Sequence, residues 1–188
     1  MSAVSQGIFV ACTPAAFFVR IVGRGACRNS VCLREYGLKK FQEGYRKVYV
    51  DLRECEAMDS TFLGVFAGFG LSLGDSGKLV LLDLSADNRR ALVDLGLDQI
   101  VGVDAAPPDA VRTEFPPAAE FEFLPGSDLT VGERPFDEVS RALLMLECHE
   151  YLCRLDERNE NKFRDVKQFL REDIARHNPG PPPKEPKG

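Results

Sequence analysis

The stretch from Val48 to Leu73 reads VYVDLRECEAMDSTFLGVFAGFGLSL and decides how the fold is interpreted. Residues 47–52 are rich in β-branched and aromatic side chains, which predicts a strand. A short polar loop follows, and Asp59 and Ser60 stand before a helix that we expect over residues 60–73. This helix is apolar nearly all round and contains several glycines, so it must be buried or must form an interface.

Strand and helix patterns alternate on both sides of this stretch. Strands are expected over residues 8–10, 17–22, 78–84 and 101–103, and helices over residues 29–44 and 86–100. Asn29 or Ser30 is the expected cap of the first helix. The near-continuous apolar run at 78–84 is typical of a central strand covered on both faces. The order predicts an α/β sandwich within residues 1–105, with helices as crossovers between parallel strands.

The composition changes after residue 105. Residues 106–135 hold six of the twelve prolines, which predicts a semi-rigid linker, although Glu120–Leu124 alternates acidic and apolar residues like a short edge strand. A helical pattern returns over residues 136–177, as two helices or one bent helix with a polar break at 156–162. Its apolar face needs a partner surface. The proline-rich residues 178–188 are expected to be a disordered tail.

The charge of the chain excludes some classes of function. The net charge is -5, and all of it belongs to residues 106–188, because residues 1–105 carry equal numbers of acidic and basic side chains. This balance argues against a nucleic-acid-binding protein. There is also no apolar run of about 20 residues for a membrane span and no signal-peptide pattern. We therefore expect a cytoplasmic protein that binds neither nucleic acid nor membranes.

The chemistry-bearing residues do not form a recognisable catalytic or metal-binding pattern. The six cysteines are Cys12, Cys27, Cys32, Cys55, Cys148 and Cys153. They include no CxxC pair, so reduced structural thiols are favoured over a metal or redox site. The only histidines are His149 and His177, and no nucleotide-binding or hydrolase motif follows a strand. We expect no catalytic residues, no metal and no cofactor, and hence no enzyme.

Three ordered segments resemble the STAS domain of anti-sigma factor antagonists. They are Val50-Asp51-Leu52 followed by Asp59-Ser60 and Leu63-Gly64-Val65, the strand at 77–82, and the helix ending at 92–100. The resemblance covers about residues 8–104. It implies a STAS-like sandwich of a mixed, mostly parallel sheet with helices, to which residues 136–177 add a C-terminal helical extension.

The resemblance also implies a phosphorylation switch. Members of the family bind an anti-sigma factor that is also a serine kinase, and they are released when it phosphorylates the serine that corresponds here to Ser60. Asp59, Thr61, Phe62 and Gly64 would then form the partner-facing rim. Phe62 stands where many members carry glycine, so this rim is expected to be less open. A phosphate at a helix start is tolerated by the helix but would disrupt a binding surface.

Other interpretations of the same residues stay open. Ser60 could be only the helix N-cap, with Asp59 as a turn residue or the alternative cap, and Thr61 could be a second phosphate acceptor. Asp51 could lie near the switch or hydrogen-bond to the backbone of its loop. The alternative function is a non-switching STAS scaffold that forms a homodimer or docks in a signalling assembly through its C-terminal helices. Those helices could also simply pack against the domain.

Overall fold

A mixed β-sheet forms the centre of the computed structural model, which describes residues 6–103, 113–128 and 137–177. The strands follow the order β6 (Gly102–Val103), β5 (Lys78–Leu82), β3 (Lys47–Asp51), β2 (Phe17–Gly25), β1 (Gly7–Cys12) and β7 (Glu122–Phe123). The first four run parallel, whereas β1 is antiparallel to both β2 and β7. The predicted mostly parallel sheet is therefore confirmed.

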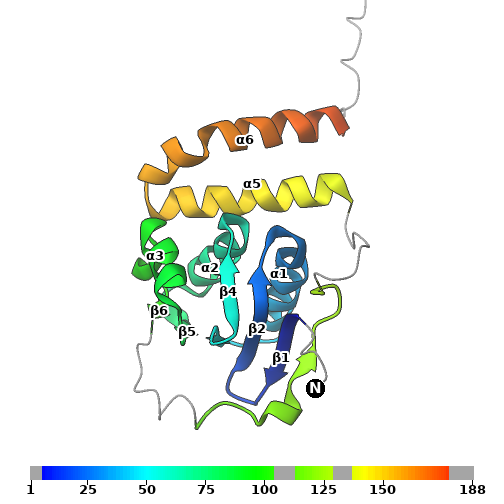
Figure 1. Ribbon diagram of the computed structural model, residues 1–188, viewed down its shortest axis with the longest axis vertical. Coiled ribbons are helices and arrows are strands. Elements are labelled where there is room, and N and C mark those ends of the chain that lie inside the picture. The colour runs from blue at the N-terminus through cyan, green and yellow to red at the C-terminus, as the bar shows by residue number, and fades with distance from the viewer. Residues whose placement is uncertain (1–5, 104–112, 129–136, 178–188) are drawn as a thin grey trace, which may run out of the picture.

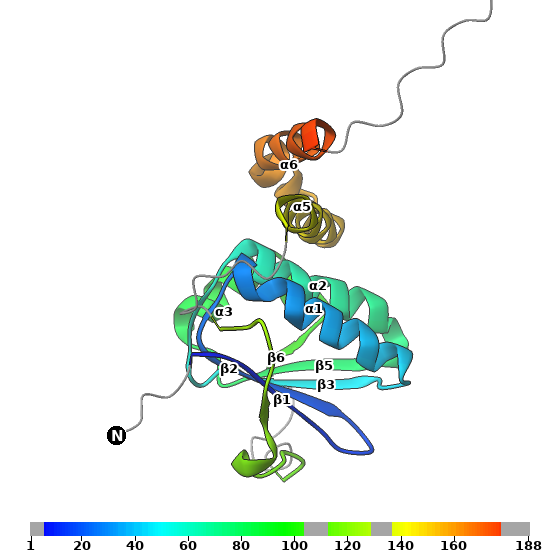
Figure 2. The same ribbon diagram turned by 90° about the vertical axis from the view of Figure 1, so that its right-hand side faces the viewer.

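Different elements cover the two faces of the sheet (Figures 1 and 2). Helices α1 (Cys27–Gln42), α2 (Ser60–Leu73) and α3 (Ala86–Asp94) pack on one face and form the main core with it. On the other face, Phe115 and Phe121 cover a smaller apolar cluster around Phe18 and Tyr49. Short 3₁₀ turns at Gly74–Ser76, Leu97–Gln99 and Ala118–Glu120 complete the described elements.

The C-terminal helices form an antiparallel pair above the first helical layer. Helix α5 (Glu138–Leu155) and helix α6 (Arg158–His177), together called the hairpin here, lie on the side of α1 and α2 that faces away from the sheet (Figure 2). The C-terminal helical extension is confirmed as two helices, and the break between them is shorter than expected. None of the described helices is long and apolar enough to cross a membrane.

The two-sided burial of α2 explains its unusual composition. One side of α2 packs on the sheet, and α5 covers the opposite side. All residues from 61 to 70 are consequently buried. A helix covered on two sides gains from apolar residues around its whole circumference, and its glycines allow close neighbours.

Two predicted details of the domain were wrong. Helix α1 begins at Cys27, so the capping position is Ala26 and not Asn29 or Ser30; the Asn29 side chain instead accepts a hydrogen bond from the Ala26 amide. Helix α3 ends at Asp94 because Gly96 adopts a left-handed conformation with φ 76°, and only a 3₁₀ turn follows. An L side chain rarely adopts this conformation, so the glycine ends the helix.

The polar loop expected after residue 52 contains a strand. Residues Cys55–Met58 form β4, which pairs in parallel with the end of β2 after a register shift at Gly23. This pairing determines where the start of α2 lies, since Asp59 follows β4 directly. In the expected linker, β7 pairs with β1, so the edge strand is confirmed. Residues 106–112 and 129–135 of the expected linker and the expected tail (178–188) lie outside the described residues.

Candidate functional site

Asp59 joins the starts of two helices. Its backbone N–H donates to the carbonyl of Gly25 at 3.0 Å, which holds it beside the end of β2. One carboxylate oxygen accepts from the N–H of Phe62 at 2.8 Å, and the other accepts from the N–H of Cys27 at 2.7 Å. The side chain is thus the N-cap of α2 and also binds the first turn of α1. A carboxylate is favoured there because the positive ends of both helix dipoles meet it.

Ser60 is the first residue of α2 and not its cap. Because Asp59 satisfies the exposed amide of the first turn, the Ser60 hydroxyl is not used by the helix. The hydroxyl oxygen lies 3.0 Å from Nε2 of His149 on α5. The interpretation of Ser60 as a simple N-cap is therefore wrong, and its polar contact comes from the hairpin.

His149 lies in an apolar environment between α5 and α6. Its residue surface is only 3% exposed, and its ring packs on Phe163 with centroids 4.5 Å apart. Burial lowers the pKa of His149, and nearby Lys167 lowers this pKa further, whereas Asp59 opposes the shift. The imidazole is therefore neutral at neutral pH. The Ser60 hydroxyl and Nε2 share one hydrogen bond, and the tautomer of the neutral ring decides which of the two donates.

The other three expected rim residues are buried. Thr61 and Phe62 have almost no exposed surface, and Phe62 packs edge-to-face on Phe66 inside the core. Its ring fills the space beside Gly25, where an added Cβ would lie 2.6 Å from it. Phe62 therefore faces inward and does not narrow the rim. Gly64 is also buried, but it faces α5 and not the sheet.

Gly64 and Gly68 let α5 approach α2 closely. A Cβ at Gly64 would lie 2.4 Å from Cβ of Cys148 and 2.8 Å from its carbonyl oxygen. A Cβ at Gly68 would lie 2.8 Å from the edge of the Tyr151 ring. These distances are shorter than real contacts, so a side chain at position 64 would require α5 to move, and one at position 68 would require the Tyr151 ring to turn. Ser60, Gly64 and Gly68 form one line along α2, called the α2 strip here, and α5 covers it.

Polar groups attach the hairpin at other points. On the side of α1, Arg34 forms an ion pair with Glu147 at 2.7 Å. At the turn between α5 and α6, the buried side-chain amide of Asn159 donates to the carbonyls of Leu95 and Leu152 at 3.0 and 2.8 Å. The bond to Leu95 connects the hairpin turn to the end of α3, and the bond to Leu152 ties the turn to α5. The turn is therefore fixed both to the domain and within the hairpin.

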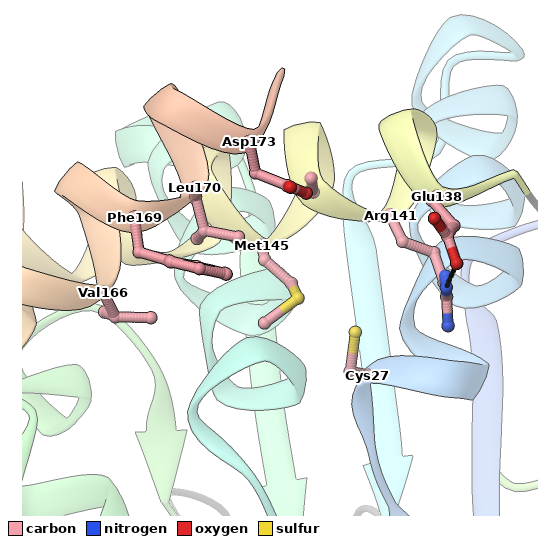
Figure 3. A pocket seen from close by; sticks show the side chains of 9 residues that line it. Cys27, Glu138, Arg141, Met145, Val166, Phe169, Leu170 and Asp173 are labelled. Carbon is pink, nitrogen blue, oxygen red and sulfur yellow. Dashed lines mark ion pairs between the residues drawn. The ribbon is translucent and has the colours of Figure 1, made fainter. Parts of the chain in front are cut away.

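An open cavity of about 410 Å³ lies beside the site (Figure 3). Met145 on α5 and Phe169 and Leu170 on α6 supply its apolar wall. Cys27, whose amide binds Asp59, lines the opposite side. The cavity therefore separates part of the hairpin from the start of α1.

Two further sequence interpretations concern Asp51 and the thiols. Asp51 accepts a hydrogen bond from the N–H of Arg53 at 3.1 Å and pairs with Arg20 at 3.3 Å, so it binds the backbone of its own loop as one interpretation held. Among the described residues, no group of three His, Cys, Asp or Glu side chains is placed to hold a metal ion. Two thiols lie near the site: Cys148 packs against Gly64, and the backbone amide of Cys27 binds Asp59.

Sequence reasoning missed His149. A signal was present, because Met145, Cys148 and Leu152 surround it on the buried side of one helix, and a histidine on such a side needs a polar partner. The serine–imidazole pair has the two atoms of a nucleophile and its base. Both atoms, however, face each other across a packed helix contact, so the pair acts here as a polar link between domain and hairpin.

The domain part of the chain matches a known family. The sequence model of the STAS domain matches residues 8–110, more than half of the chain. The chain belongs to the STAS family. The hairpin and His149 lie beyond the matched residues, whereas Asp59 and Ser60 lie inside them. No match was found among curated protein sequences.

Among solved structures, this chain is similar to anti-sigma factor antagonists. An anti-sigma factor antagonist from Mycobacterium paratuberculosis is 19% identical with a TM-score of 0.50, and the match covers 60% of this chain and 97% of that one. A putative anti-sigma factor antagonist from Thermotoga maritima is 21% identical, with a TM-score of 0.49 and coverage of 55% and 91%. The unphosphorylated form of the anti-sigma factor antagonist SpoIIAA is 18% identical, with a TM-score of 0.46 and coverage of 59% and 96%.

Proposed function

We propose that this STAS protein is a phosphorylation-switched adaptor in the cytoplasm, which binds an anti-sigma factor or a similar serine kinase while Ser60 is unphosphorylated. One observation supports this most directly. Asp59 caps α2, so the domain itself does not use the Ser60 hydroxyl, whose contact is His149 outside the family match. The partner class follows the names of the solved neighbours, which are anti-sigma factor antagonists.

A phosphate on Ser60 would end binding without unfolding the domain. It adds roughly -1.5 to -2 charges at the start of α2, where the helix dipole favours negative charge. The Asp59 carboxylate next to it is already held by two backbone amides, so the helix start stays capped. A partner packed on the same surface would have to desolvate the new dianion beside a carboxylate, which is unfavourable.

The partner-binding residues have two different roles in this proposal. Asp59 and Ser60 supply the polar contacts, and Gly64 provides a place where a partner backbone can approach closely. Thr61 and Phe62 are buried and position the helix start from below. Thr61 is for the same reason a poorer phosphate acceptor than Ser60.

Mass spectrometry of the protein from its native cells tests the proposal, with phosphate expected on the peptide that contains Ser60. Tagged Ser60→Ala should co-purify with a protein that has a serine-kinase domain, and Ser60→Asp should lose it. Ser72→Asp is the matched control, because Ser72 is exposed at the other end of α2. If Ser60→Ala and Ser60→Asp retain the same kinase-like partner as the wild type, the switch is wrong.

The second candidate is the non-switching scaffold, in which the hairpin makes a homodimer or docks in an assembly. The apolar stripe of α5 packs inside this chain, but Phe169 on α6 is 58% exposed beside the open cavity. Light scattering after size exclusion, with the wild type and Phe169→Glu, tests it. A dimer that Phe169→Glu converts to a monomer would support the scaffold, and a monomeric wild type would oppose the homodimer.

A further inference from the structure

The α2 strip is occupied by a helix of the same chain. We propose that α5 is a built-in competitor for the partner surface, so that the hairpin must move off α2 before a partner binds or Ser60 is phosphorylated. The identity of the competing partner rests on the proposed function. The opening of the hairpin does not, because it is a property of the chain alone.

Helix α5 and a partner cannot occupy the α2 strip at the same time. The backbone of Cys148 lies so close to Gly64 that even a methyl group would not fit between them. At Ser60, the hydroxyl oxygen is 3.0 Å from His149 Nε2, so a phosphoryl group on that oxygen would replace this bond and crowd the imidazole. Any partner that contacts Gly64, and any kinase that reaches Ser60, must therefore displace α5.

The attachment of the hairpin is uneven along its length. Near the turn, Leu152 is fully buried and Asn159 makes its two bonds to main-chain carbonyls. The first half of α5 is packed less closely, because the cavity of about 410 Å³ lies on one side and a second cavity of about 310 Å³ separates it from α1 on the other. Regions with fewer packed contacts open at lower free energy than the core. Opening should therefore begin at the Glu138 end and pivot at the turn.

The polar contacts that α5 makes with α1 and α2 can be exchanged for water. Arg34 and Glu147 each have about a third of their side chains exposed, so their ion pair adds little to stability. The Ser60–His149 bond joins two neutral groups, and such bonds give a small net stabilisation because water replaces them on opening. Neither contact prevents α5 from leaving the strip.

The native cysteines allow the opening to be measured in the unmodified full-length chain. Cys148 is on the side of α5 that packs against Gly64 and is 1% exposed. Cys32 and Cys55 are buried in the domain core. Burial raises the pKa of all three thiols, to about 11 for Cys32 and Cys55, so each reacts only after its region opens. Exposed Cys12, whose thiol lies 3.2 Å from the Tyr36 hydroxyl, is the solvent-accessible reference.

The decisive experiment is alkylation with N-ethylmaleimide under native conditions, resolved for each cysteine by mass spectrometry and normalised to its rate in denaturant. If the hairpin opens separately, Cys148 should react at least about tenfold faster than Cys32 and Cys55. Equal rates for the three thiols would mean that α5 leaves only when the domain unfolds, which would overturn the proposal.

A pair of variants tests the competition. Cys148→Glu places a charge against the α2 strip and should raise hydrogen exchange in α2, Ser60 phosphorylation and partner binding several-fold. Leu143→Glu puts the same charge on an exposed part of α5 and should change none of them. If Cys148→Glu opens the hairpin but binds the partner only as well as the wild type, α5 is no competitor. If no form, Ser60→Ala included, binds a kinase, the proposed function fails, while the alkylation rates still decide whether the hairpin opens.

Discussion

Ser60 on α2 and His149 on α5 are 89 positions apart in the sequence, and their side chains lie 3.0 Å from each other. Ser60 belongs to the part of the chain that matches the STAS domain, and His149 does not. The bond therefore connects the candidate switch residue with the hairpin that covers it. A change at either residue should alter the position of the other.

Ser60→Asp should open the hairpin. At pH 8 the new carboxylate would face a buried, neutral imidazole and the carboxylate of Asp59. This disfavours the closed state, in which α5 covers the α2 strip. We expect Cys148 to be alkylated several-fold faster than in the wild type, with a smaller increase for Ser60→Ala. Ser72→Asp should leave the rate unchanged. A slower rate in Ser60→Asp would indicate that the carboxylate forms an ion pair with a charged His149.

Gly64→Ala should disturb the hairpin more than Gly68→Ala. The new methyl at position 64 meets Cβ and the backbone of Cys148, which move only with the whole helix, whereas at position 68 it meets the edge of the Tyr151 ring, which can turn. Overpacking of this kind costs about 1–3 kcal/mol. We expect the free energy of unfolding, measured by denaturant unfolding, to fall by an amount in that range for Gly64→Ala. For Gly68→Ala the loss should be near the lower end of the range or below it. Equal losses would contradict the close backbone contact at Gly64.

Local chemistry made some of this structure predictable. Asp-Ser before an apolar run predicted the start of α2 at residue 60, because a capping carboxylate and a change of periodicity are both local signals. The glycines of α2 indicated that something approaches closely. Their pattern does not identify the neighbour, since the residues of α5 that meet Gly64 and Gly68 lie more than eighty positions away in the chain.

Other features depend on tertiary pairing that the sequence does not express locally. Strand β4 mixes polar and apolar residues in only four positions, and it forms because β2 continues past a register shift to pair with it. The same pairing brings Asp59 beside Cys27. The start of the site could therefore be located in the sequence, whereas its bonds to α1 and α5 could not.

The closed state should become less stable as the pH falls. Burial lowers the pKa of His149 below its ordinary value of 6.5, with Lys167 reinforcing the shift and Asp59 opposing it. The stabilisation is therefore complete above pH 6.5 and is lost as the pH falls through 6.5 towards the lower pKa of the folded state. The open population, measured by normalised Cys148 alkylation, should rise by at most about tenfold per pH unit in that window.

His149→Gln is the control for this pH dependence. Glutamine can accept a hydrogen bond from Ser60 but does not titrate, so the acid-induced part of the opening should disappear. If His149→Gln keeps the pH dependence of the wild type, another group is responsible for it.

Asn159→Ala should weaken the pivot of the hairpin. The buried amide donates to two carbonyls, and its removal leaves both without that donor, at a cost of about 1–3 kcal/mol. Asn161→Ala, two positions later on the exposed side of α6, should cost less than about 0.5 kcal/mol. Chemical denaturation of the two variants measures the difference. Similar small losses in both would show that the turn does not hold the hairpin.

Asp59→Ala should cost more than the loss of an ordinary cap. Asp59 accepts from the first turns of two helices, whereas Ser85, the cap of α3, accepts only from Asn88. A single cap is worth about 1 kcal/mol, so we expect about 2 kcal/mol for Asp59→Ala and about 1 kcal/mol for Ser85→Ala. Equal unfolding free energies for the two variants would contradict the bridging role.

The short strand β7 determines how strongly a displaced hairpin competes. After β7, the buried Ser127 hydroxyl accepts from the amide of Ile8 at 2.9 Å, which fixes the chain to β1 shortly before α5 begins. The span from 128 to 137 can reach no further than about 30 Å, so α5 stays near α2 at an effective concentration in the millimolar range. A partner displaces α5 only if the ratio of its concentration to its dissociation constant exceeds the same ratio for α5. Partners that bind weakly or are scarce would therefore not bind. In the proposed competition, the tether would thereby set a threshold for partner binding.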